Sequence, residues 1–173
     1  MEHLRLYTDG SYYKERPNEV HGGLCNDDAS MDSWIHVYSN NKQLTSMWNV
    51  GGEIIAAYTA IVATVNFVKE KNKEIMDTYE LELVYDYEGI GHWLTGRWQA
   101  KKPATQWFVR ESKRLLNEVP NLKLALTWVK GHTGKDDLIS AGNSNADKVS
   151  AYDMRFCKEH SIPICSADEY IKL

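Results

Sequence analysis

The stretch of residues 4–11, Leu-Arg-Leu-Tyr-Thr-Asp-Gly-Ser, constrains the fold of this chain more than any other. Its bulky and polar residues alternate as in a β-strand, and Gly10 and Ser11 end the pattern directly after Asp9. An acid in this position lies at the end of a strand, where open sheets bind their ligands. Gly10 has no side chain to hold a substrate backbone away, and Ser11 offers a hydroxyl or an amide to a phosphate. The same tripeptide is ordinary in turns, so other features must decide whether it marks a site.

The next part of the sequence predicts further strands and then a long helix. Three strand-like segments come first, at residues 20–26, 33–39 and 43–50. The last of them is expected to be the third strand of an antiparallel meander. Gly51 and Gly52 then break the pattern, and Glu53 opens a segment whose apolar residues recur at helical spacing.

Strands and helices alternate in the second half of the sequence. Residues 79–85 predict a strand that is covered on both faces and ends at Asp86. After it we expect a helix at residues 89–94 and a second helix from Pro103 to near Val119 and Pro120. A strand at residues 122–129 and a polar loop at residues 135–144 should follow. The last helix is expected from Ser144 or Asn145 to about Glu159. This order predicts an α/β fold in which helices pack on a mixed sheet.

Composition predicts one globular domain. A chain of 173 residues with 43% apolar and 25% charged residues can build an ordinary core, expected at about residues 4–160. No apolar run is expected to reach the roughly 18 residues of a membrane span, and no signal peptide is recognisable, so we expect a cytoplasmic protein without a membrane partner. The three cysteines form no Cys-x-x-Cys pair and are expected to be reduced structural thiols. No heptad pattern or large apolar stripe is left over, which favours a monomer.

The tail at residues 161–173 has two interpretations. It either packs on the sheet through its apolar residues or binds a partner, and packing is favoured. The apolar residues are Ile162, Ile164, Tyr170 and Ile171.

A basic segment between Thr95 and Arg114 is the one region suited to a polyanion. The net charge of −4 opposes indiscriminate binding to nucleic acid, so any such contact must be local. The segment carries cations with aromatic residues between them: Arg97, Lys101, Lys102, Arg110, Lys113 and Arg114, with Trp98, Trp107 and Phe108. Aromatic rings pack on sugars or bases while cations hold phosphates. The alternative is a solvated helix face with buried aromatics.

Four acids at the ends of predicted elements suggest a metal site. They are Asp9, Glu53, Asp86 and Asp147. Each acid alone is typical of a surface charge or a helix cap, but a cluster of hard oxygen ligands selects magnesium or manganese, and carboxylates brought close together require cations between them. Two ions about 3.5 to 4 Å apart activate a water and stabilise the leaving oxygen in phosphodiester cleavage. His132, on a nearby loop, has a side chain suited to relaying protons near neutral pH.

Four motifs, taken in order, resemble type 1 ribonuclease H. They are Asp-Gly-Ser after the first strand, Gly-Gly-Glu-Ile-x-Ala in the first helix, Asp-Tyr-x-Gly-Ile after the later strand, and Trp-Val-Lys-Gly-His-Thr-Gly followed by Gly-Asn-x-x-Ala-Asp. The resemblance runs from Leu4 to about Val149, and the last motif is the most specific. It implies a ribonuclease H-like fold with a five-stranded mixed sheet, in which three antiparallel leading strands and two parallel strands are flanked by helices.

The resemblance also implies a function and roles for the acids. The chain is expected to be a metal-dependent endonuclease that cuts the RNA strand of RNA/DNA hybrids and leaves 3′-hydroxyl and 5′-phosphate ends. Two Mg²⁺ ions, which Mn²⁺ can replace, would be held by the four acids: Asp9 bridges both ions, Glu53 and Asp86 hold one, and Asp147 holds the other. His132 is similar to the catalytic-loop histidine of the family.

Substrate contacts follow from the same resemblance. Asn49 is similar to an asparagine that reads the minor groove of the hybrid, and Asn143 to one near a phosphate of the DNA strand, while Gly10 and Ser11 would face the RNA backbone. Trp98, Lys101 and Lys102 lie in a segment similar to a shortened form of the family's basic handle. The chain departs from the family where it has Trp48 and Val50 on either side of Asn49.

Three alternatives stay open. A related DNA-directed nuclease or transferase shares acid-rich strand ends, but the motif around His132 disfavours it. An inactive module that only binds nucleic acid or protein predicts the loss of at least one metal acid, and all four are present. A ribonuclease H domain of a reverse transcriptase is the third, and the start at Met1 favours a free-standing enzyme instead.

Overall fold

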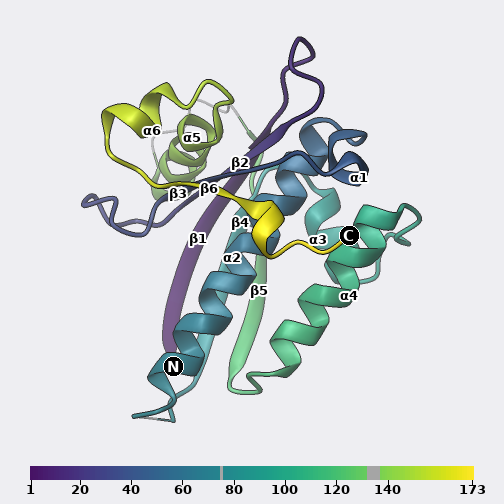
Figure 1. Cartoon of the computed structure of the whole chain (residues 1–173). Helices are drawn as coiled ribbons and strands as arrows, with labels where there is room; N and C mark the ends of the chain where they lie inside the picture. The colour runs from purple at the N-terminus through teal and green to yellow at the C-terminus, as the bar shows by residue number, and fades with distance from the viewer. Residues whose placement is uncertain (75, 132–136) are drawn as a thin grey trace.

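The computed structural model describes residues 1–74, 76–131 and 137–173 (Figure 1). Its strands are β1 (Glu2–Ser11), β2 (Val20–Cys25), β3 (Ile35–Ser39), β4 (Tyr79–Tyr85), β5 (Leu122–Trp128) and β6 (Ile164–Ser166). Its helices are α1 (Lys42–Thr45), α2 (Asn49–Lys71), α3 (Gly89–Leu94), α4 (Pro103–Asn117), α5 (Leu138–Ser150) and α6 (Arg155–Glu159), followed by the 3₁₀ turn η1 (Ala167–Glu169).

The strands form one mixed sheet in the order β5-β4-β1-β2-β3-β6. β1, β2 and β3 pair antiparallel, whereas β4 is parallel to β1 and β5 is parallel to β4. These five strands are the expected ribonuclease H-like arrangement, so the predicted fold class is confirmed. The sheet has six strands rather than five because the short β6 in the tail pairs parallel with β3.

Helices α2 and α5 cover opposite faces of the sheet, and a pair of glycines in β2 lets both come close. A Cβ at Gly22 would lie 2.9 Å from the Cβ of Ala56 in α2, whereas a Cβ at Gly23 would lie 2.6 Å from the carbonyl oxygen of Ala146 in α5. Successive strand residues point to opposite faces, so neighbouring glycines serve the two helices in turn. Figure 1 shows α4 beside α2.

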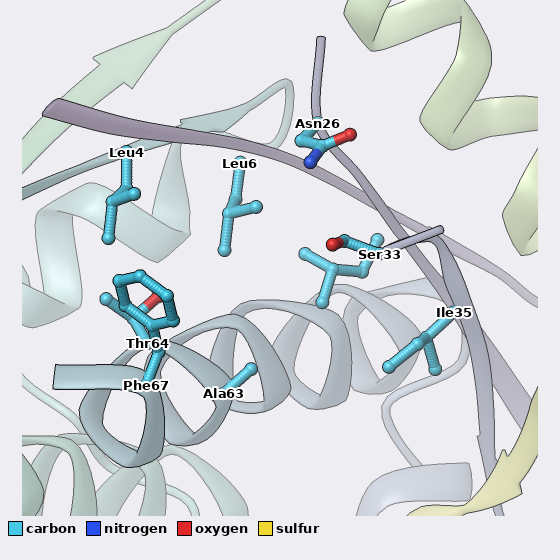
Figure 2. A pocket seen from close by; sticks show the side chains of 9 residues that line it. Leu4, Leu6, Asn26, Ser33, Ile35, Ala63, Thr64 and Phe67 are labelled. Carbon is cyan, nitrogen blue, oxygen red and sulfur yellow. The ribbon is translucent and has the colours of Figure 1, made fainter. Parts of the chain in front are cut away.

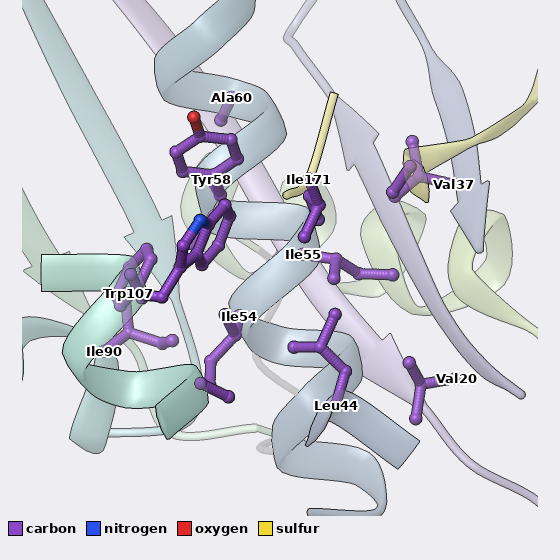
Figure 3. Packing of buried hydrophobic residues seen from close by; sticks show 14 of the residues in the cluster. Val20, Val37, Leu44, Ile54, Ile55, Tyr58, Ala60, Ile90, Trp107 and Ile171 are labelled. Atoms are coloured by element: carbon purple, nitrogen blue, oxygen red, sulfur yellow. The ribbon is translucent and has the colours of Figure 1, made fainter. Parts of the chain in front are cut away.

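The main core lies between the sheet and α2, and it includes residues that the sequence placed on a binding surface. Figure 3 shows Trp107 of α4 packed against Tyr58 of α2, with ring centroids 4.4 Å apart. Trp107 is 2% exposed and Phe108 is fully buried. Of the two interpretations left open for the basic segment, that of buried aromatics therefore holds for these two rings.

Helix α2 has the length and mean hydropathy of a membrane span, so the expectation that no apolar run approaches that length was too strict. Of its most apolar stretch, 72% is buried inside the structure. A central helix covered on several sides shows the same apolar composition as a membrane span.

The prediction of a strand at residues 43–50 is wrong, because this segment forms α1 and the first turn of α2. The Asn41 side chain accepts a hydrogen bond from Gln43 N and caps α1. The apolar residues Leu44 and Met47 recur at a spacing of three, which fits a helical turn rather than a strand.

Gly51 and Gly52 lie inside α2 and do not break it, so the helix begins one turn before Glu53. A Cβ at Gly51 would overlap the carbonyl oxygen of Leu44, and a Cβ at Gly52 would overlap that of His21. The glycines thus permit close packing against α1 and β2. This packing sets Glu53 in the second turn, facing inward.

The last predicted helix is also wrong in its bounds. Asp137 caps α5 by accepting a hydrogen bond from Ser140 N, so the helix starts well before Ser144. It ends at Ser150, and a left-handed residue, Met154, separates it from α6. Of the predicted polar loop at residues 135–144, positions 135 and 136 lie outside the described residues.

The tail packs on the rest of the fold. Ile162 and Ile171 are each 4% exposed, while Ile164, also expected to pack, is 36% exposed. The Tyr170 hydroxyl shares a hydrogen bond of 2.5 Å with Thr59 in α2. The cysteines Cys25, Cys157 and Cys165 are free thiols, as expected.

Packing of the tail predicts different effects for two isoleucines. Ile171→Ala empties a buried site and is expected to lower the free energy of unfolding by about 2–4 kcal/mol. Ile164→Ala, on an exposed side chain of the same tail, should change it by less than about 1 kcal/mol. Urea unfolding followed by circular dichroism measures both. Equal small effects would contradict a structural role for the tail.

Candidate metal centre

Two neighbouring parallel strands bring Asp9 and Asp86 together. β1 and β4 pair with Tyr7 opposite Val84, and the same register continued by two residues sets Asp9 beside Asp86. Glu53 reaches them from the second turn of α2. One carboxylate oxygen from each residue contributes to a group of three oxygens that all lie within 4.8 Å of one another. The structure therefore brings together three of the four predicted acids.

Burial makes this cluster electrostatically unfavourable when it is charged. Asp9 is 5% exposed and Glu53 is 4% exposed. Burial raises the pKa of Asp9 to about 8, with the negative charges of Asp86 and Asp147 acting in the same direction. Burial and the charges of Asp9 and Asp86 hold the pKa of Glu53 well above its ordinary range. Without a cation, the group retains protons near neutral pH.

One oxygen of the cluster is left without a partner. Asp9 Oδ1 accepts a hydrogen bond of 2.9 Å from the Gly10 amide. Glu53 Oε2 is buried and has no hydrogen-bond partner among residues 1–74, 76–131 and 137–173. A buried carboxylate oxygen without a donor is costly. The orphaned oxygen and the all-carboxylate donor set fit a hard divalent cation such as Mg²⁺ or Mn²⁺.

The fourth acid, Asp147, lies on α5 and is exposed. It is close enough to Asp9 to help raise the pKa of that residue. Two hydrogen bonds hold the end of α5 near it: His36 Nδ1 donates to Val149 O at 2.7 Å, and Ser11 Oγ donates to Ser150 O at 2.8 Å. Asp147 thus stands at the rim of the buried cluster.

His132 lies outside the residues that the structure describes. The chain that leads to it passes the cluster, since a Cβ at Gly131 would lie 3.1 Å from Asp86 Oδ2. Trp128 Nε1 also donates a hydrogen bond of 3.0 Å to Asp86 O. The motif that contains His132 therefore begins beside Asp86.

Three of the predicted substrate contacts have different surroundings from those expected. A Cβ at Gly10 would overlap Glu53 N, so this glycine makes room for α2, and its contact with the RNA backbone stays a prediction. The Ser11 hydroxyl is used by Ser150 O, as described above. Asn143 is 7% exposed, so its side chain is buried in α5 rather than presented to solvent.

Three other predicted contacts, Asn49, Lys101 and Lys102, lie on the surface in two grooves. The first groove is lined by Asn49 and Trp48 with Tyr12 and Lys14 of the β1–β2 loop. The second is lined by residues of the turn between α1 and α2, of α2, α3 and α4, and of the segment before α4, among them Trp48, Lys101 and Lys102. The sequence reasoning missed Tyr12 and Lys14, although an aromatic residue beside a cation was a visible signal.

Trp98 is 37% exposed and packs on His92 and Trp93, with ring centroids 4.8 and 6.0 Å away. The basic residue Arg114 of the same segment forms ion pairs with Glu111 and Glu118 at 2.9 and 2.8 Å. The Arg114 charge is therefore paired with carboxylates in and next to α4 and is not free for a polyanion.

An apolar pocket lies at the other end of α2 (Figure 2). Leu4 and Leu6 of β1 face Thr64 and Phe67 of α2 across it, and its remaining lining is apolar or neutral. Phe67 follows Glu53 by fourteen residues, which is roughly 21 Å along a helix. The pocket is separate from the carboxylate cluster.

Comparisons with known proteins agree with this fold. A family model, RNase H, matches residues 1–154. No curated protein matches the chain. Among solved structures, RNase H1 from the halophilic archaeon Halobacterium salinarum is 19% identical with a TM-score of 0.58, covering 88% of this chain and 96% of that one. LC11-RNase H1, isolated from compost by a metagenomic approach, is 19% identical with a TM-score of 0.60, covering 86% of this chain and 93% of that one.

A second structure of LC11-RNase H1 was solved in complex with an RNA/DNA hybrid. It is 17% identical with a TM-score of 0.52, covering 84% of this chain and 91% of that one. At these sequence identities, the likeness to solved structures shows a shared fold and no more.

The raised pKa of Asp9 predicts how stability depends on pH. The native carboxyl keeps its proton up to about pH 8, whereas the ordinary value is 3.8. The native state therefore binds more protons between these values, and the free energy of unfolding of the metal-free protein should fall as pH rises through this window. Added Mg²⁺ should restore more stability at about pH 8 than at about pH 5, because a divalent cation would bind the deprotonated cluster.

Asp9→Asn tests this prediction, because it removes one buried charge. At about pH 8 in chelator, the free energy of unfolding of the variant should exceed that of the wild type by at least about 1 kcal/mol. This is close to the free energy that corresponds to a shift of one pKa unit. It should also gain less from Mg²⁺. Asp32→Asn, at an exposed position outside the cluster, is the control. Urea unfolding at both pH values measures the effect, and identical pH dependence in wild type and Asp9→Asn would contradict the prediction.

Proposed function

The chain belongs to the RNase H family and is a ribonuclease H, and from this premise we propose that it hydrolyses the RNA strand of RNA/DNA hybrids at the carboxylate cluster. The products would be a 3′-hydroxyl and a 5′-phosphate. The observation that carries the proposal is the group formed by the buried Asp9 and Glu53 and the partly buried Asp86, whose oxygens lie within 4.8 Å of one another. Such a group is unfavourable for stability alone and is typical of a site that binds cations.

Two Mg²⁺ ions are the proposed cofactors, with Mn²⁺ able to replace them. When bound, they would supply an activated water and charge stabilisation at the leaving oxygen. Asp9 would contact both ions, Glu53 and Asp86 one, and Asp147 the other. The Gly10 amide orients Asp9 through its hydrogen bond to Oδ1. His132 would carry a proton to or from the reacting phosphate group.

The hybrid would be held by the surface beside the cluster. LC11-RNase H1, which shares this fold, has been solved with an RNA/DNA hybrid, and that precedent supports the same substrate here. Asn49 is exposed at the start of α2, one turn before Glu53, and is proposed to read the minor groove. Lys101 and Lys102 are exposed and would contact phosphates, with Trp98 beside them.

Two other functions compete with this proposal. A nuclease or transferase acting on DNA would use a similar carboxylate cluster. An inactive binding module would not need to keep buried acids, because each one lowers stability when charged. The presence of all four acids, with Asp9 and Glu53 buried, favours an enzyme.

Cleavage of matched duplexes tests the proposal. We expect the wild type to cut a labelled RNA strand paired with DNA, in Mg²⁺ or Mn²⁺ but not in chelator, and to leave the same RNA paired with RNA, and a DNA duplex, intact. Asp9→Asn should lower kcat by at least about a thousandfold, or about 4 kcal/mol of transition-state stabilisation. Gel electrophoresis of the labelled strand measures the rates and the product ends.

Asp32→Asn is the control and should cleave at the wild-type rate. Binding of hybrid without cleavage in any metal would favour the inactive module. Cleavage of the DNA duplex would move the protein to the DNA-directed branch.

A further inference from the structure

Trp48 combines two features that a tryptophan rarely shows together. Its side chain is 64% exposed, and its backbone has a φ of 58° and a ψ of −134°. A positive φ is unusual for any residue with a side chain and a strong outlier for a bulky one. Neither burial of the ring nor relaxed backbone geometry explains why this residue is a tryptophan.

The surrounding structure enforces this conformation. Trp48 N donates to Thr45 O at 3.1 Å, and Trp48 O accepts from Gly51 N at 3.0 Å. Leu44 in α1 lies so close to Gly51 that a Cβ there would overlap its carbonyl oxygen. Outliers that are held from both sides in this way cluster at functional sites.

The exposed indole separates the two grooves beside the carboxylate cluster. Lys14 lines the groove on one side, and Lys101 and Lys102 line the groove on the other. Trp48 precedes Glu53 by five residues, which is roughly 7.5 Å along a helix. The carbonyl oxygen of Asn49, the next residue, would lie 2.9 Å from a Cβ at Gly10, so this turn touches the end of β1 next to Asp9.

A nucleic-acid duplex fits this arrangement, because it presents one phosphate backbone to each groove and sugars to the ridge between them. We propose that Trp48 packs its ring face on a deoxyribose of the DNA strand of the hybrid and thereby disfavours ribose at that nucleotide. The inference rests on the proposed function. A deoxyribose offers an apolar C2′ to the ring, whereas a ribose would lose the hydration of its 2′-hydroxyl against a surface that cannot accept a hydrogen bond.

The test uses Trp48→Gly, which removes the ring and also accepts the positive φ. Glycine adopts this backbone without strain, so the variant should melt at the wild-type temperature or above it. It should nevertheless raise KM for an RNA/DNA hybrid by on the order of tenfold, within the range for loss of an aromatic contact to nucleic acid, and leave kcat within about threefold. Trp48→Phe keeps a ring face and should keep KM near the wild-type value.

Single ribonucleotides placed in turn along the DNA strand give a second readout. The wild type should cut more slowly when the ribonucleotide occupies one position, or two adjacent positions, relative to the cleavage site, and Trp48→Gly should lose that penalty. Because the penalty is a ratio of two rates on one protein sample, partial unfolding of a variant does not alter it. Phe67→Ala, which removes an exposed ring at the far end of α2, is the matched control and should keep the penalty.

The outcomes distinguish this inference from the function on which it rests. If the wild type cuts the hybrid but Trp48→Gly keeps both KM and the penalty, the role of Trp48 is wrong and the ribonuclease proposal stands. If the wild type cuts no hybrid in Mg²⁺ or Mn²⁺, the proposed function fails first and the inference with it.

Discussion

Mutual repulsion of buried carboxyl groups is the constraint on which the rest of this structure depends. Asp9, Glu53 and Asp86 converge where burial weakens solvation of their charges, and the pKa values of Asp9 and Glu53 rise in response. Such a group disperses unless rigid elements hold it. The parallel pairing of β1 with β4 fixes two of its members, and the buried first half of α2 fixes the third.

The strands and helices that carry the acids are held in place because their backbones pack closely against one another. Gly10 lets the end of β1 touch the first turns of α2, and Gly52 lets the same helix touch β2. On the other face Gly23 admits α5, whose end is fixed by bonds from Ser11 and His36. A Cβ at any of these glycines would meet backbone atoms. The position of Asp147 relative to the cluster therefore depends on glycines, which have no side chain to take part in catalysis.

The sequence predicted the strand ends and their acids because alternation and a terminal carboxylate are local features. It failed where tertiary packing decides. Gly51 and Gly52 were expected to separate a strand from the helix that opens at Glu53, but they lie inside α2 and let other backbone come close, which no local pattern reveals. Trp107 resembles a surface contact, and only the packing of α4 buries it. His132 is still a prediction from its motif, since it lies outside the described residues.

The charges of the protein favour a duplex locally while the whole chain, at −4, repels it. Lys14 on one side of Trp48 and Lys101 on the other are placed to contact phosphates, but the carboxylates beside the two grooves would repel the phosphate that is to be cut. Divalent metal ions would be needed to offset this local repulsion. Binding of a hybrid would then depend on the lysine ammonium groups, and cleavage on the metal ions. Added salt weakens the lysine contacts by screening and counterion competition, whereas an apolar contact such as that proposed for Trp48 does not depend on charge. A ring at the ridge would therefore add affinity that does not depend on the charges of the lysines.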